Sequence, residues 1–244
     1  MSIAFSCLQL NKFYSNIELV TDKLGKKLII DMLGLPYSSV VIELDQLNNH
    51  HRDLWALGKI YAYSIQKEPF LHIDNDVFIW ARFDTSIENA AIVVQSEEFA
   101  TSFFAHLANK LLIDHTYLPQ RYLDFMKGTG YLPNYNAGVL GGSDLNFIKE
   151  YTQEVFEFIK CYAHKFNDEI RTLMNVFYEQ FFLYCLSRSK NIAVEFLFNR
   201  DYLASIYENN NFRRLVKDGK YLHVHHKKIN HHIKYVLTTW VMLN

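Results

Sequence analysis

The chain has 244 residues, half of them hydrophobic, with 25 basic and 26 acidic side chains. A nucleic-acid-binding protein usually has a clustered basic excess, so this balance argues against a nucleic-acid partner. Three widely separated cysteines argue against a disulfide or zinc framework, and no apolar run is long enough for a transmembrane segment. No signal peptide is evident either, and we expect one cytoplasmic domain over residues 1–244.

The first part of the chain alternates helices and strands. Helical spacing of apolar side chains predicts helices over Ile3–Tyr14, Lys23–Leu33 and Leu54–Gln66. Short apolar runs predict strands over Ile17–Thr21, Val40–Leu44 and Phe70–Ile73. This order is typical of an α/β fold with a parallel sheet and crossover helices. Asp22 and Asp74 follow two of the strands at their carboxyl ends, where such sheets bind ligands.

The remaining elements are predicted from the same signals. Strands are expected over Ala90–Gln95 and Tyr221–His225, and helices over Glu97–Leu112 and Asn175–Arg188. The second of these helices is strongly aromatic, which predicts that it is buried. Lys127–Gly142 is rich in Gly, Pro and Tyr and is expected to be mostly loop with one short strand. Ser143 is expected to cap a long helix that runs to about His164.

The segment around Asp74 and Asp76 carries the strongest chemical signal. These two carboxylates are separated by one residue and follow an apolar strand. Hard divalent cations need oxygen ligands, and such a cation neutralises the charge of a sugar diphosphate. The alternative is an acidic turn between two strands, which Asn75 would also favour.

Three segments in the same order resemble GT-A glycosyltransferases. Phe70–Phe78 resembles their Asp-x-Asp strand. Asn136–Gly142 resembles the Asn-x-Gly-hydrophobic segment of glycogenin-like enzymes. Leu222–Lys228 resembles their closing segment, in which a His ligates the metal and a Lys meets the diphosphate. The resemblance implies a GT-A-like, Rossmann-type mixed sheet flanked by helices, with Mn²⁺ or Mg²⁺ as cofactor and a UDP-sugar as donor.

The resemblance also implies metal ligands. Asp74 would lie near the ribose and the metal, and Asp76 would ligate the metal directly. His223 or His225 would complete the protein ligands, and Lys228 would meet the diphosphate. Alternation places both His on one strand face, so spacing alone does not choose between them. We favour His223 because its position best resembles the closing segment.

Further residues gain roles from the same resemblance. The Asn136 amide can bond a sugar hydroxyl, and Gly138, Gly141 and Gly142 would let the backbone approach a ligand. Lys59 would face the donor phosphate and Asp22 the nucleobase or ribose. Glu179 and Gln180 resemble an acidic-Gln pair that lines the acceptor side. The plainer alternatives are a turn-rich loop, a solvated helix Lys and an acid that ends a strand.

One departure from the GT-A pattern concerns the start of the chain. The first strand of that fold is expected to be absent, through truncation, a misassigned start or divergence, because the sequence opens with the helix at Ile3. We expect a glycosyltransferase that moves a sugar from a UDP-sugar to a glycan, peptide or small-molecule acceptor. The alternatives are a non-catalytic nucleotide-sugar-binding relative and a metal-dependent nucleotidyl- or phosphotransferase.

Overall fold

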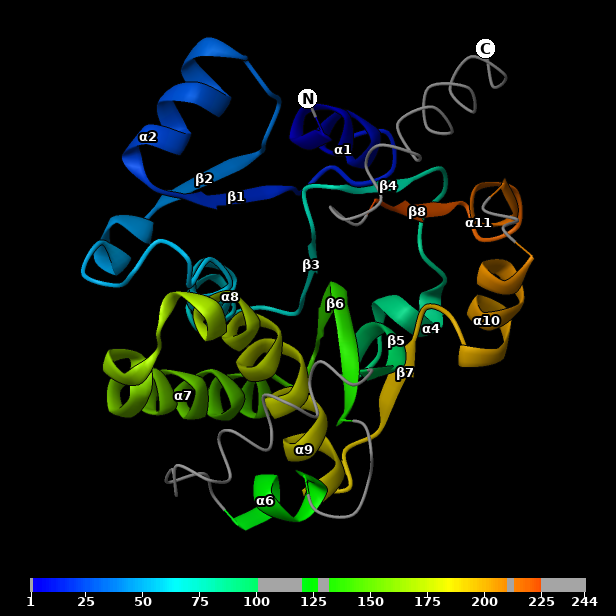
Figure 1. The fold of residues 1–244 in the computed structure, drawn as a ribbon. Helices are drawn as coiled ribbons and strands as arrows, with labels where there is room; N and C mark the ends of the chain where they lie inside the picture. Colours follow the sequence, from blue (N-terminus) through cyan, green and yellow to red (C-terminus); the bar gives the residue numbers. More distant parts are fainter. Residues whose placement is uncertain (1, 101–119, 127–131, 210–212, 225–244) are drawn as a thin grey trace. The chain divides into compact units, whose positions relative to one another are not determined.

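A computed structural model describes residues 2–100, 120–126, 132–209 and 213–224. The fold is mixed α/β, with open sheets of parallel and antiparallel strands flanked by helices (Figure 1). It divides into two compact units, unit 1 within residues 1–42, 73–83 and 201–244, and unit 2 within residues 43–72 and 84–200. In the part that the structure describes, no helix has both the length and the apolar character needed to cross a membrane.

Unit 1 contains two small pairs of strands. One pair is parallel and consists of β1 (Glu18–Thr21) and β2 (Ser39–Ile42). The other is antiparallel and consists of β4 (Val77–Ile79) and β8 (Tyr221–His223). The helices are α1 (Ser2–Leu10), α2 (Lys23–Lys26), its π-helical continuation η1 (Lys27–Met32), α10 (Arg200–Glu208) and α11 (Arg213–Lys217).

The helix between β1 and β2 begins and ends where the sequence predicts. The Asp22 carboxylate accepts a hydrogen bond from the Gly25 amide at 2.5 Å, which caps the first turn of the helix. At the other end Gly34 has a φ of 61°, and its amide donates to the Ile30 carbonyl. Glycine adopts this left-handed conformation without a steric penalty, so it ends the helix. The predicted strand–helix–strand unit over residues 17–44 is therefore confirmed.

Unit 2 is built around a four-stranded sheet. Its strand order is β3 (Phe70–Ile73), β6 (Leu132–Gly142), β5 (Ile92–Ala100) and β7 (Val194–Phe196). β5 runs antiparallel to β6 and parallel to β7. The helices are η2 (Leu44–Leu47), α3 (Leu57–Ser64), α4 (Thr85–Glu88), α6 (Gln120–Met126), α7 (Leu145–Tyr162), η3 (Ala163–Lys165), α8 (Asp168–Val176), η4 (Phe177–Phe181) and α9 (Phe182–Ser189).

One face of this sheet packs against the core. The segments α8, the π-helical η4 and α9 follow one another directly, and both η4 and α9 contact β6 (Figure 1). Their aromatic side chains fill the interior, as the stacking of Tyr122 on Phe182 at 4.1 Å between ring centroids illustrates. The prediction of a buried aromatic helix over Asn175–Arg188 is confirmed.

The central strands of unit 2 are longer than predicted. Residues 97–100 continue β5, so the helix predicted from Glu97 is wrong there, and the rest of that predicted helix, up to Leu112, lies outside the described residues. Residues 132–142 form one eleven-residue strand rather than mostly loop. The local Gly, Pro and Asn preferences for turns are overridden because β6 is paired on both sides, by β3 and by β5.

Two smaller expectations are also corrected. The cap of α7 is Asp144, whose carboxylate accepts from the Phe147 amide at 3.0 Å, whereas the Ser143 hydroxyl donates to the Ala90 carbonyl. β3 does not extend the parallel pair of β1 and β2, because it belongs to the sheet of unit 2 beside β6.

Two glycines at the end of β6 are required by close backbone packing. A Cβ atom on Gly141 would lie 2.0 Å from the Phe70 carbonyl oxygen, which belongs to the neighbouring strand β3. A Cβ atom on Gly142 would lie 2.1 Å from the Ala91 carbonyl oxygen, and the φ of Gly142 is 134°. Neither obstacle is a flexible side chain, so an added methyl group would have to displace backbone.

We expect Gly141→Ala to destabilise the protein by about 2 kcal/mol, because the new methyl group forces β3 and β6 apart. Gly58→Ala is the matched control, since its Cβ would meet only Leu44 Cδ1 at an ordinary 3.7 Å. There the substitution is expected to stabilise by about 0.5 kcal/mol, because it removes freedom from the unfolded chain. Urea denaturation of both variants checks this, and equal free energies of unfolding would contradict the packing argument.

Candidate metal centre

The pairing of β4 with β8 brings two distant parts of the sequence together. Val77 lies opposite His223 in the register, and the Val224 amide donates to the Asp76 carbonyl at 3.0 Å. The side chains of β4 pack tightly against the rest of unit 1. Val77 and Ile79 are buried, and the Phe78 ring contacts Phe5 of α1 at 4.9 Å between centroids. The residue just before β4 and the last residue of β8 are therefore held side by side.

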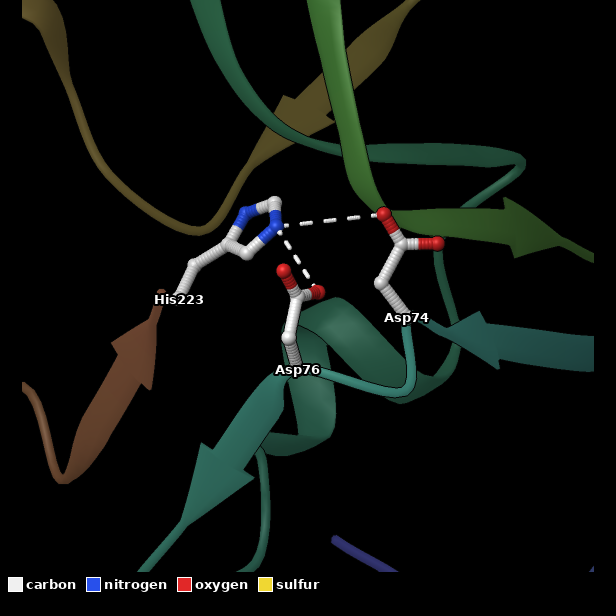
Figure 2. A group of neighbouring side chains, drawn as sticks. All are labelled: Asp74, Asp76 and His223. Carbon is white, nitrogen blue, oxygen red and sulfur yellow. Dashed lines mark ion pairs between the residues drawn. The ribbon is translucent and has the colours of Figure 1, made fainter. Parts of the chain in front are cut away.

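Asp74, Asp76 and His223 converge at this point (Figure 2). The His223 Nε2 atom lies 3.3 Å from an Asp76 carboxylate oxygen and 3.8 Å from an Asp74 carboxylate oxygen. One potential ligand atom from each side chain lies within 4.8 Å of the others. The exposed fraction of the side chain is 9% for His223, 18% for Asp74 and 36% for Asp76, so the cluster opens to solvent on the Asp76 side.

This donor set fits a divalent cation such as Mn²⁺ or Mg²⁺. Carboxylate oxygens suit hard cations, and a neutral imidazole is an acceptable further ligand for Mn²⁺. Three protein ligands would leave further coordination positions for water or phosphate oxygens. Of the predicted residues in this region, Asp74, Asp76 and His223 are brought together, whereas His225 and Lys228 lie outside the described residues.

Asn136 lies on β6 in unit 2, and its amide is bonded at both ends. The side-chain oxygen accepts from the Gly138 amide at 2.9 Å, and the side-chain nitrogen donates to the Glu98 carboxylate at 2.8 Å. Gly141 and Gly142 lie further along the strand, against protein backbone. Glu98 is not among the predicted site residues, because the helix predicted over Glu97–Leu112 includes it. Polar side chains at alternate positions, 96 and 98 on one strand and 134 and 136 on the other, were the signal that could have found it.

Lys59 and Glu179 form a buried ion pair in unit 2. The Lys59 Nζ atom lies 2.8 Å from a Glu179 carboxylate oxygen, and the Glu179 side chain is completely buried. Burial first, and then the nearby Glu179 carboxylate, raise the pKa of both Tyr151 and Tyr178. Lys59 therefore compensates a buried carboxylate on the π-helical segment η4, and the donor role of Lys59 and the catalytic role of Glu179 stay predictions.

Asp22 and Gln180 are the two remaining predicted site residues. Asp22 caps α2 through the hydrogen bond from Gly25 described above, so at least one of its carboxylate oxygens is engaged. Gln180 is half-buried on η4. Their roles in nucleotide and acceptor binding stay predictions as well.

The chain matches the family of unknown function DUF6734 over residues 1–244 and belongs to that family. No curated protein and no solved structure matches the chain.

Removing Lys59 should be costly, because the Glu179 carboxylate would remain buried without that cation. We expect Lys59→Met to lower the free energy of unfolding by about 3 kcal/mol, measured by urea denaturation. The double variant Lys59→Met/Glu179→Gln is expected to recover part of the loss, since an amide is less costly to bury than a charge.

Lys190→Met is the matched control for this experiment. Lys190 pairs with Glu150 at 2.7 Å, but both side chains are about 40% exposed, and solvent screens such pairs. We expect a change of less than about 1 kcal/mol there. Equal losses in Lys59→Met and Lys190→Met would show that the buried pair contributes no more than a surface pair.

Proposed function

We propose that this member of the DUF6734 family is a metal-dependent glycosyltransferase of the GT-A kind, which moves a sugar from a UDP-sugar to an acceptor. The observation that carries the proposal is the convergence of Asp74, Asp76 and His223, which lie on two of the three segments that resemble those enzymes. The acceptor would be a glycan, a peptide or a small molecule.

The three residues of the candidate metal centre differ in burial, and we assign their roles accordingly. His223, the most buried of the three, is fixed by β8 and would hold its imidazole against both carboxylates. Asp76 is the most exposed and would be the ligand nearest to an entering nucleotide. The divalent cation, when bound, would stabilise the negative charge on the diphosphate that leaves with UDP.

The composition of the Asp74–Asp76–His223 cluster bears on the alternative functions. A nucleotidyl- or phosphotransferase that uses the same acidic pair would call for a third carboxylate beside the first two. Among the described residues the third member of the cluster is an imidazole, and no further carboxylate belongs to it. This composition favours the glycosyltransferase. A non-catalytic nucleotide-sugar-binding relative would use the same centre, so turnover has to be measured directly.

We expect UDP with Mn²⁺ to raise the melting temperature of the parent protein. In Asp76→Asn this Mn²⁺-dependent increase should be absent. A ligand that binds only the folded protein at a hundredfold excess over its dissociation constant stabilises it by about 2.7 kcal/mol. His223→Ala should weaken the Mn²⁺-dependent shift, because it removes the nitrogen ligand. Differential scanning fluorimetry with and without EDTA measures all three proteins.

Asp31→Asn is the matched control, because Asp31 is exposed and pairs with Lys26 in a surface contact at 2.7 Å. It should leave the shift unchanged. An undiminished shift in Asp76→Asn would overturn the metal role of the pair. Release of UDP from UDP-glucose, UDP-galactose or UDP-N-acetylglucosamine in the presence of Mn²⁺ then separates an enzyme from a binding protein.

A further inference from the structure

The two faces of the paired strands β5 and β6 differ in character. Glu97 and Tyr135 lie opposite each other and face α9, where the Tyr135 ring contacts Tyr184 at 5.1 Å between centroids and Glu97 pairs with Arg188. The neighbouring positions alternate to the other face. There the cross-strand pairs are Ser96 with Asn136 and Glu98 with Asn134, which together we call the polar strand face.

The register is irregular at the start of the polar strand face. Val94 pairs with Leu140 and Ser96 with Asn136, so one residue of β5 lies opposite three residues of β6. Asn136 stabilises the irregular segment, because its oxygen accepts from the Gly138 amide and its nitrogen holds the Glu98 carboxylate. Bulges of this kind are over-represented next to active sites, where they re-aim side chains.

Two members of the polar strand face lack hydrogen-bond partners within the described residues. Ser96 is 0% exposed and Asn134 is 4% exposed, yet the Ser96 Oγ atom and the Asn134 Oδ1 atom make no hydrogen bond there. A polar atom that is buried without a partner destabilises the fold, because it has lost its hydrogen bonds to water and gained none in return. Native structures rarely keep buried polar atoms in this state unless they have a use.

We propose that the polar strand face binds the hydroxyl groups of a sugar, with Ser96 and Asn134 as the contacts and Asn136 as a positioning residue. The groups on offer are mainly acceptors, so the ligand must bring donors. A sugar hydroxyl both donates and accepts, which matches a serine hydroxyl, an amide oxygen and a carboxylate. The Glu98 carboxylate disfavours a phosphate at this place, because like charges repel.

This inference deepens the proposed function, on which it rests for the choice of a sugar as ligand. It assigns sugar recognition to residues of unit 2, apart from the metal ligands. Binding of a free monosaccharide at the polar strand face should therefore need no metal ion. The two proposals can fail separately for this reason.

The test uses the full chain in EDTA with glucose, galactose, mannose and N-acetylglucosamine, each observed by saturation-transfer difference NMR. We expect at least one of the four sugars to bind. Ser96→Ala and Asn134→Leu should each weaken that binding about tenfold, which corresponds to one lost hydrogen bond. Both variants should melt at the parent temperature or above, because an apolar group replaces a buried atom without a partner.

Ser189→Ala is the matched control, since Ser189 lies at the exposed end of α9, where its hydroxyl donates to the Leu186 carbonyl, and it should not affect sugar binding. The inference is overturned if no sugar of the panel binds, or if Ser96→Ala and Asn134→Leu bind as tightly as the parent. It is also overturned if these variants melt well below the parent, since the atoms would then serve stability. Sugar binding without a Mn²⁺-dependent UDP shift would contradict the metal centre alone.

Discussion

The antiparallel pairing of β4 with β8 is the constraint on which the candidate metal centre depends. Two carboxylates one residue apart repel each other, and a nearby imidazole or cation reduces that repulsion. The register of the two short strands places the His223 imidazole 3.3 Å from Asp76 and 3.8 Å from Asp74. The buried side chains of β4 and the Phe5–Phe78 contact hold that register in place.

The buried polar groups of unit 2 fall into two kinds. Glu179 is fully buried, but Lys59 lies 2.8 Å away and compensates its charge within the chain. Asn175 is similar, since its side-chain oxygen accepts from both the Ala56 amide and the Tyr178 hydroxyl. Ser96 and Asn134 are different, because the described residues offer their oxygen atoms no partner. Groups of the first kind have partners within the fold, whereas those of the second kind have none among the described residues, which is why we propose a ligand for them.

Local signals were sufficient for the strand that leads to the metal centre. The apolar run at residues 70–73 ends at Asp74, and β3 has those bounds in the structure. Spacing could not choose between His223 and His225, because alternation puts both on one face of a strand. The structure places His223 beside the two carboxylates through the pairing of β4 with β8, a contact between distant segments, whereas His225 lies outside the described residues.

The wrong predictions for β5 and β6 arise because local sequence does not reveal pairing between distant segments. Glu97 and its neighbours have no local signal that separates a strand from a helix, and Pro133, Asn134 and Gly138 favour turns. These residues form strands because each segment is paired with another that is remote in sequence. The glycines at the end of β6 were expected to make room for a ligand, whereas the space at Gly141 and Gly142 is taken by backbone of the protein itself.

The order in which the ligands occur along the chain has a consequence for biosynthesis. Asp74 and Asp76 are synthesised early. His223 lies on β8, which follows all the other described helices and strands in chain order. At a translation rate of about 5–20 residues per second, His223 is synthesised many seconds after Asp74 and Asp76. Under the proposed metal role, a nascent chain would expose two carboxylates that bind cations only weakly, and full affinity would arise when β8 pairs with β4. In that case metal loading would follow the synthesis of β8.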